Sequence, residues 1–287
     1  MSRIVYVNGR YRPHAEAAVH VEDRGFQFAD AIYEVVEVRN RRLVDSRRHL
    51  DRLERSLGEI RMTPPMSRPA LLNVIRQTIQ RNMVQQGLVY IQVSRGAGPR
   101  DFAFPADDIQ PTVVVIARSQ NPAKIAATAD AGIVVKTMPD IRWGRSDIKT
   151  VMLLPACLAK NEGKAQGAAE IWLVDANGNV TEGASSNAWI LTADGCLVTR
   201  HLDTRILPGV TRATVIDAAA ASKLTLVERA FSVREAYEAK EAFITSATNT
   251  VMPVVRIDEY VIGDGRPGPL TRQLRSAFHH IAETSDY

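Results

Sequence analysis

The stretch RWGRSDIKT, residues 142–150, joins a short apolar run, IVVKTM at 133–138, to an amphipathic pattern at 150–165. The short apolar run predicts a strand, and the amphipathic pattern predicts a helix. Lys149 therefore lies where we expect a core-facing helix to begin. Desolvation at such an apolar border favours a neutral, nucleophilic amine, so Lys149 is a candidate for Schiff-base chemistry. A solvated surface lysine is the alternative.

The segments after residue 165 predict two hairpins followed by mixed elements. Asn177-Gly178 lies between alternating runs at 171–183, and this pair is a strong signal for a two-residue hairpin turn. A second hairpin is predicted at 187–200. We then expect an alanine-rich helix at 211–223, a short buried strand at 242–245 and an exposed strand at 254–262. A closing helix, which Thr271 could cap, is expected at 270–283.

The segments before residue 133 predict a second set of strands and helices. Asn8-Gly9 is another hairpin signal, and AIYEVVEV at 31–38 reads as a strand. At 46–60, leucines recur at helical spacing opposite charged residues, which predicts an amphipathic helix. A further helix is expected at 69–84, and strands are expected at 88–94 and 112–118.

Residues 119–131 combine weak apolar periodicity with Pro, Asn and small residues, so we expect the interdomain linker there. The chain then divides into an N-terminal α/β domain at 1–118 and a C-terminal domain at 132–287 that carries Lys149. Both parts mix strands with helices, and the predicted class is α+β.

Composition excludes several classes of protein. The chain has 287 residues, with 36 Lys and Arg against 32 Asp and Glu, and the net charge of +4 gives little support for a nucleic-acid or membrane partner. An arginine-rich stretch at 39–55 leaves a basic binding module as a non-enzymatic alternative, although acidic residues interrupt it. The two cysteines cannot form a disulfide framework, and the opening MSRIVYVNGRYRPH has no basic region followed by an apolar one, so no secretory leader is expected. We therefore expect a cytoplasmic protein.

Most catalytic motifs are missing from the sequence. The six histidines form no paired ligand motif, so no metal site is expected. G-x-S-x-G, the P-loop and the dinucleotide fingerprint do not occur. The seven lysines all follow residue 123, and Lys149 has the most unusual surroundings among them.

Several segments together resemble the class IV, or fold-type IV, pyridoxal-phosphate-dependent aminotransferases. The segments are RGFQFADAIYEV at 24–35, HLDRL at 49–53, SDIKT at 146–150, VTEGASSNAWI at 180–190, RILPGVTR at 205–212 and FITSAT at 243–248. Within this family, IYEV at 32–35 and RWGRSDIK at 142–149 look like the D-amino-acid, or D-alanine, transaminases. The resemblance covers nearly the whole chain and implies a two-domain fold with pyridoxal 5'-phosphate between the domains.

The resemblance implies a role for each matched residue. Lys149 would bind the cofactor covalently and carry a proton during amino transfer, and Glu182 would keep the cofactor's ring nitrogen protonated. Leu207 would pack against the ring. An arginine fork, and backbone amides at a helix N-terminus, suit a phosphate group. The residues matched to the phosphate are Arg52, Gly209, Val210, Thr211 and Thr248.

Substrate binding is where the sequence departs from the family pattern. In the D-amino-acid transaminases, a tyrosine, matched by Tyr33, and an R-x-H pair from the neighbouring subunit hold the substrate carboxylate. This chain reads Arg100-Asp101-Phe102, so Arg100 can still bind a carboxylate but Phe102 supplies no donor. The shared loop implies a homodimer.

The activity expected from this resemblance is ping-pong transfer of the amino group of a D-amino acid, such as D-alanine, to a 2-oxo acid such as 2-oxoglutarate. An (R)-amine transaminase, a branched-chain L-amino-acid transaminase and an aminodeoxychorismate lyase are alternatives with the same fold.

Overall fold

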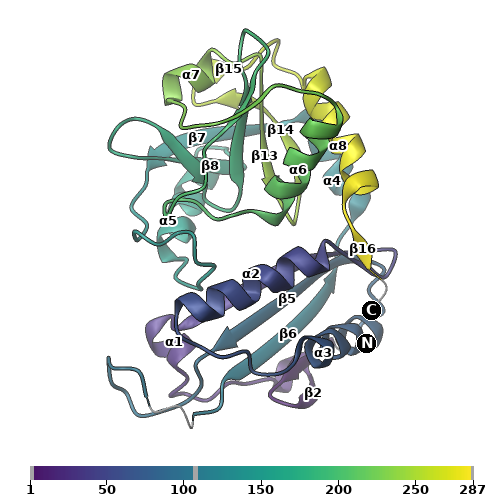
Figure 1. Ribbon diagram of the computed structural model, residues 1–287, viewed down its shortest axis with the longest axis vertical. Coiled ribbons are helices and arrows are strands. Elements are labelled where there is room, and N and C mark those ends of the chain that lie inside the picture. Colours follow the sequence, from purple (N-terminus) through teal and green to yellow (C-terminus); the bar gives the residue numbers. More distant parts are fainter. Residues whose placement is uncertain (1–2, 106–108, 286–287) are drawn as a thin grey trace. The chain divides into compact units, whose positions relative to one another are not determined.

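The computed structural model describes residues 3–105 and 109–285. The chain divides into two compact units, each with its own sheet and helices (Figure 1). Unit 1 comprises Met1–Asn121, Ile148–Met152 and Glu283–Tyr287, and unit 2 comprises Pro122–Asp147 and Leu153–Ala282. Both units mix strands with helices, as the α+β prediction requires.

Unit 1 contains, among its described residues, a seven-stranded antiparallel sheet in the order β16-β4-β3-β5-β6-β1-β2. Strands β3 and β5 form its long central pair, which runs from Ala31 opposite Ser94 to Arg39 opposite Gln86. The strands are β1 (Ile4–Val7), β2 (Arg10–Pro13), β3 (Ala31–Arg39), β4 (Arg42–Val44), β5 (Gln86–Ser94), β6 (Thr112–Ser119) and β16 (Thr284–Ser285).

The two faces of this sheet differ in burial because side chains alternate along each strand. On β3, one face carries four buried residues: Ile32, Glu34, Val36 and Val38. The opposite face of β3 carries Tyr33, Val35 and Glu37, which are only half-buried. Glu34 is therefore a charged residue on the apolar face.

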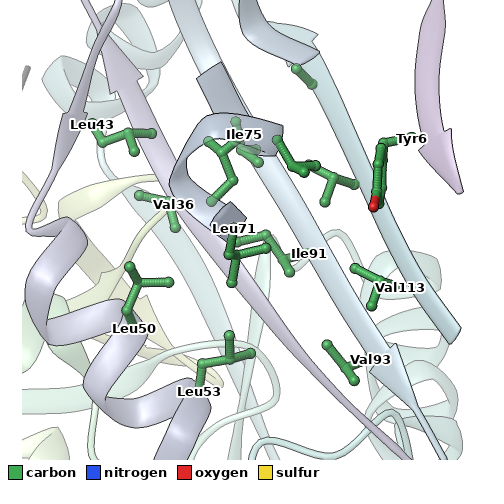
Figure 2. Close-up of a cluster of buried hydrophobic side chains, with 14 of the residues drawn as sticks. Tyr6, Val36, Leu43, Leu50, Leu53, Leu71, Ile75, Ile91, Val93 and Val113 are labelled. Atoms are coloured by element: carbon green, nitrogen blue, oxygen red, sulfur yellow. The ribbon is translucent and has the colours of Figure 1, made fainter. Parts of the chain in front are cut away.

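Helices α2 (Ser46–Glu59) and α3 (Arg68–Arg81) pack against the buried face. Leu50 and Leu53 of α2 and Leu71 of α3 point toward the strands in Figure 2. Full burial of one leucine contributes about 2 kcal/mol, so this layer supplies much of the stability of unit 1. Two shorter elements of this unit are the 3-10 helix η1 (His14–Glu16) and helix α1 (Arg24–Phe28).

Unit 2 contains, within its described residues, a nine-stranded mixed sheet. Its order is β12-β11-β10-β13-β14-β7-β8-β9, and β15 pairs with β14. Three pairs are parallel, namely β11 with β12, β14 with β7, and β7 with β8. The strands are β7 (Ile133–Pro139), β8 (Glu170–Val174), β9 (Val180–Gly183), β10 (Asn187–Leu191), β11 (Leu197–Thr199), β12 (Leu226–Glu228), β13 (Glu241–Ser246), β14 (Thr250–Ile257) and β15 (Tyr260–Val261).

The helices of unit 2 bury small and apolar side chains against this sheet. Helices α6 and α8 lie side by side, and α8 also contacts β13 and β14 (Figure 1). The helices are α4 (Pro122–Ala131), α5 (Leu154–Ala165), α6 (Val210–Ala221), α7 (Val233–Tyr237) and α8 (Pro269–Ile281). Over residues 3–105 and 109–285, no helix is long and apolar enough to span a membrane.

The predicted hairpins are confirmed. Strands β1 and β2 pair across Asn8-Gly9, where both residues have positive φ, and β8 pairs with β9 across the turn that contains Gly178 at φ +77°. Strands β10 and β11 form the third predicted hairpin. These turns follow from residues that adopt left-handed backbone easily.

Four predicted elements differ from the structure. The helix expected from residue 150 begins at Leu154, because the preceding residues pair with β3 and Pro155 suits a helix start. Residues 122–131, expected within the linker, form helix α4. The strand expected to be exposed at 254–262 is divided between β14, which is largely buried within the sheet, and β15. The N-cap of α8 is Gly268, so Thr271 lies inside that helix.

Candidate functional site

Lys149 is held in unit 1 by backbone pairing with β3. The amide of Tyr33 donates to the carbonyl of Lys149 at 2.9 Å, and the amide of Val151 donates to the carbonyl of Ala31 at 3.0 Å. The Lys149 amide donates to Ser56 Oγ of α2 at 3.4 Å. These contacts are the reason that Ile148–Met152 belongs to unit 1, whereas the sequence placed Lys149 in the C-terminal domain.

The amine of Lys149 lies over an aromatic surface. Its Nζ is 4.2 Å from the ring centroid of Tyr33, within the range of a cation–π contact. The Tyr33 ring stacks on Tyr90 at 5.6 Å between centroids, and the Tyr90 hydroxyl donates to Gln92 Oε1 at 2.6 Å. Burial raises the pKa of Tyr90 to about 12, so its hydroxyl stays protonated at neutral pH. The structure thus brings together two predicted site residues, Lys149 and Tyr33.

Arg52 is bound to a carboxylate on the other face of β3. Its Nε donates to Glu34 Oε1 at 2.7 Å and its Nη2 donates to Glu34 Oε2 at 2.8 Å. His49 Nδ1 lies 2.7 Å from Glu34 Oε2. Burial opposes ionisation of Glu34, but the charge and hydrogen bonds of Arg52 and His49 outweigh it and hold the Glu34 pKa well below its usual range. Burial lowers the pKa of His49, which favours its neutral form.

Glu34 and His49 were assigned no role from the sequence. The sequence does contain a signal for Glu34. Side chains alternate between the two faces of a strand, so Glu34 lies on the same face as Ile32, Val36 and Val38. A charged residue at a core-facing position needs a partner of opposite charge. The helix after the strand, with Arg52 one turn from His49, could have supplied that partner.

Glu182 is a buried carboxylate at the centre of a polar network in unit 2. It lies on β9, and its Oε2 accepts from Asn187 Nδ2 at 2.9 Å and from the Leu207 amide at 3.1 Å. Its Oε1 accepts from Arg142 Nη1. Burial raises the pKa of Glu182 to about 7, although Arg142 and the Leu207 amide act in the opposite direction.

Arg142 is a third residue without a role predicted from the sequence, although it opens the RWGRSDIK motif. Its Nε donates to Asp140 Oδ1 at 2.9 Å and its Nη2 donates to Asp140 Oδ2 at 2.8 Å. Thr181 Oγ1 donates to the same carboxylate at 2.8 Å. Asp140 therefore fixes the guanidinium that faces Glu182.

The raised pKa of Glu182 predicts a pH-dependent stability for the protein without cofactor. A carboxyl whose folded pKa is raised contributes stability that is present below its unfolded pKa and is lost as pH rises through about 7. Glu182→Gln, which stays neutral, should therefore equal the wild type near pH 4 and exceed it by about 3 kcal/mol at pH 8. Urea unfolding between these pH values measures the difference. The exposed Glu162→Gln is the control, and parallel curves for wild type and Glu182→Gln would contradict the prediction.

Asn187 links Glu182 to the turn before α6. Besides Glu182, Asn187 Nδ2 donates to the Leu207 carbonyl at 3.0 Å. A Cβ on Gly209 would lie 2.0 Å from Asn187 Oδ1, so no larger residue fits there. Gly209 is the N-cap of α6, and Val210 and Thr211 form its buried first turn. Three of the predicted cofactor residues thus follow one another at the start of this helix, and Leu207 lies two positions before them.

Thr248 lies in the turn between β13 and β14, at the same end of the sheet of unit 2. Asn187 is opposite Thr245 in the β10–β13 ladder, which places this turn near the start of α6. Thr248 Oγ1 is 3.1 Å from Ser246 Oγ, and the Asn249 amide closes the turn on the Ser246 carbonyl at 3.3 Å. The structure therefore brings Thr248 to the same end as Glu182, Leu207 and Gly209.

Arg100 and Phe102 lie beside helix α1 in unit 1. The guanidinium carbon of Arg100 is 5.3 Å from the ring centroid of Phe28 and 6.0 Å from that of Phe102, while the two phenylalanine rings are 5.6 Å apart. Arg24 Nη1 donates to the Asp101 carbonyl at 2.6 Å and fixes the loop between them. The Phe102 side chain is 82% exposed.

Comparison with known proteins places this geometry in a family. Residues 31–257 match the model for amino-transferase class IV. D-alanine aminotransferase of Staphylococcus haemolyticus is 35% identical over 280 residues, which is 98% of each chain. Among solved structures, branched-chain amino acid aminotransferase of Escherichia coli superposes with a TM-score of 0.87 at 23% identity, covering 98% of this chain and 95% of its own. A hypothetical aminotransferase from Mycobacterium tuberculosis, in a PLP-bound form, gives 0.83 at 21%, covering 96% and 98%. The chain belongs to the class IV aminotransferases.

Proposed function

We propose that this class IV aminotransferase acts on D-amino acids, with D-alanine or a close relative as donor and a 2-oxo acid such as 2-oxoglutarate as acceptor. The observation that carries the proposal is the 35% identity to D-alanine aminotransferase of Staphylococcus haemolyticus along 98% of both chains. The branched-chain enzyme of Escherichia coli shares only 23% identity, a level that supports the fold alone.

Class IV aminotransferases depend on pyridoxal phosphate. The donor set of this chain fits that group. Unit 2 carries the buried carboxylate of Glu182, which suits a protonated ring nitrogen, and a helix start at Gly209, where backbone N–H groups suit a phosphate. Unit 1 carries the amine of Lys149 over the Tyr33 ring. When bound, pyridoxal phosphate supplies an electron-withdrawing ring and an aldehyde.

In this proposal, each matched residue has one task toward the cofactor. Lys149 holds the aldehyde end through its amine and moves a proton at the substrate Cα, and Glu182 accepts the hydrogen bond of the ring nitrogen. Leu207 packs against the ring. The phosphate is held by the guanidinium of Arg52, by amides and a hydroxyl at the start of α6, and by the hydroxyl of a turn. The residues at the start of α6 are Gly209, Val210 and Thr211, and the turn residue is Thr248.

Arg100 and Tyr33 are proposed to hold the substrate carboxylate, with the Arg100 loop shared between the subunits of a homodimer. Phe102 offers an aromatic face instead of a donor, since its ring lies beside Phe28. A branched-chain L-amino-acid transaminase is therefore the second candidate, because an apolar residue at this position favours apolar substrates. A cytoplasmic location stays a prediction from the sequence.

A paired-substrate screen tests the proposed function. Amino transfer to 2-oxoglutarate would be measured with D- and L-alanine, D- and L-leucine, and the two enantiomers of 1-phenylethylamine. We expect D-alanine to react with the highest kcat/KM. A preference for L-leucine would favour the second candidate, and a preference for the (R)-amine would favour an amine transaminase; either result would overturn D-amino-acid specificity.

Arg100→Ala should raise KM for D-amino acids while leaving KM for amines nearly unchanged, because only amino acids present a carboxylate to the guanidinium. A charge-assisted contact of this kind predicts roughly a 10- to 100-fold increase. Steady-state kinetics with D-alanine and an (R)-amine measure the two effects. Arg118→Ala, an exposed arginine on β6, is the matched control. Equal losses for both substrates would show that Arg100 does not bind the carboxylate.

A further inference from the structure

The turn that carries Thr248 ends in a strained residue. Thr250, the first residue of β14, has φ +54°. This left-handed region suits glycine and asparagine, whereas a β-branched residue clashes with its own backbone there. The Thr250 side chain is buried, and its hydroxyl donates to the Asn249 carbonyl at 2.7 Å. Some other part of unit 2 must therefore stabilise this backbone conformation.

A single arginine from α8 contacts the strained residue and both of its neighbours. Arg275 Nη1 lies 2.8 Å from the Asn249 carbonyl, 3.0 Å from Thr250 Oγ1 and 2.5 Å from the Val251 carbonyl. These three acceptors converge on one nitrogen only while Thr250 keeps its left-handed conformation. In an extended conformation at Thr250, the Asn249 and Val251 carbonyls would lie about 6.6 Å apart along the strand, too far apart for one nitrogen to donate to both.

Helix α8 is well placed to set this geometry. It packs against α6 and β14, and it lies beside α6 along its length (Figure 1). The Glu241 carboxylate of β13 accepts from the Leu270 amide at 3.0 Å and from the Thr271 amide at 2.8 Å, which fixes the first turn of α8 on the sheet. Arg275, one turn further on, therefore has a defined position relative to the β13–β14 turn.

We propose that Arg275 is a positioning residue for phosphate binding: by holding Thr250 left-handed, it sets the turn that presents Thr248 to the cofactor phosphate. The inference rests on the proposed role of Thr248. Arg275 reaches the backbone on the C-terminal side of Thr248 and acts on the phosphate only through that turn. The sequence assigned Arg275 no role, because its partners lie 24 to 26 residues away.

The test compares pyridoxal phosphate with pyridoxal, which lacks the phosphate group. Their Kd values are measured on the full chain, freed of cofactor, by absorbance titration for Arg275→Ala, Thr250→Gly and the double variant. Arg275→Ala should raise Kd for pyridoxal phosphate about tenfold and leave Kd for pyridoxal unchanged. Arg272→Ala, on the same helix, is the matched control. Thermal unfolding of each variant verifies that it folds.

The double variant separates positioning from general stability. Glycine adopts the left-handed conformation without strain. In the Thr250→Gly background, Arg275→Ala should therefore raise the Kd for pyridoxal phosphate only about twofold. A tenfold loss in both backgrounds, or an equal loss for pyridoxal, would overturn the proposal. A wild type that binds pyridoxal phosphate no better than pyridoxal would instead remove the phosphate site itself. Thr248→Val, which should lower that preference, tests the site independently of Arg275.

Discussion

Lys149→Ala is expected to lower amino transfer from D-alanine by roughly 10³-fold or more, because the variant lacks the amine that would hold the cofactor and move the proton. The fold should survive, because main-chain hydrogen bonds hold residues 149–151 in place. The Tyr33 amide donates to the Lys149 carbonyl, the Val151 amide donates to the Ala31 carbonyl, and the Lys149 amide donates to Ser56 Oγ. We expect the free energy of unfolding to change by less than about 1 kcal/mol.

Two further variants sharpen this experiment. Lys149→Arg keeps a positive charge over Tyr33 but not a nucleophilic amine, so it should be as inactive as the alanine variant. Lys164→Ala, at an exposed position on α5, should retain full activity. Turnover of the order of the wild type in Lys149→Ala would remove Lys149 from the mechanism.

Glu34→Leu should destabilise the protein by about 3–5 kcal/mol, the largest stability effect expected for a single substitution here. The change leaves the Arg52 guanidinium buried without its bidentate acceptor, and it leaves His49 Nδ1 without the carboxylate 2.7 Å away. Urea unfolding of the protein without cofactor measures the loss.

A double variant distinguishes a lost charge partner from a packing defect. In Glu34→Leu/Arg52→Leu, both charges are replaced by apolar groups, and we expect a recovery of at least about 2 kcal/mol relative to Glu34→Leu. Glu37→Leu, on the half-buried face of the same strand, should change stability by less than about 1 kcal/mol. Additive losses in the double variant would contradict the assignment of Glu34 as the charge partner of Arg52.

The parts of the fold that the sequence predicts well depend on neighbouring residues only. Asn8-Gly9 and the turn at Gly178 encode hairpins through their own backbone preferences, and the leucines of α2 mark a helix through their spacing. The helix expected from residue 150 starts four residues late because Thr150 bridges to Ile32, more than 100 residues earlier in the chain. A local pattern contains no information about such a partner.

In the candidate site too, some residues are predictable from the sequence and others are not. Motif resemblance selected Lys149, Glu182 and Arg52 from the sequence, because the family signature includes these residues. The residues that hold them, such as Glu34 beneath Arg52 and Arg142 beside Glu182, lie 18 and 40 positions away from their partners. Charged pairs at such separations form only when the chain has folded, so the sequence marks Glu34 as a charge at a core-facing position but does not show which residue pairs with it.

The backbone pairing around Lys149 also limits how its amine can travel. With bonds to β3 at the Lys149 carbonyl and at the Val151 amide, and a bond to α2 at the Lys149 amide, the main chain is fixed to unit 1. Movement of the nitrogen between two chemical tasks must then come from torsion about the four methylene groups of the side chain, which costs rotamer entropy and no backbone rearrangement. The protein therefore places a flexible tether on an immobile anchor, so the reach of the amine is set by the length of one side chain.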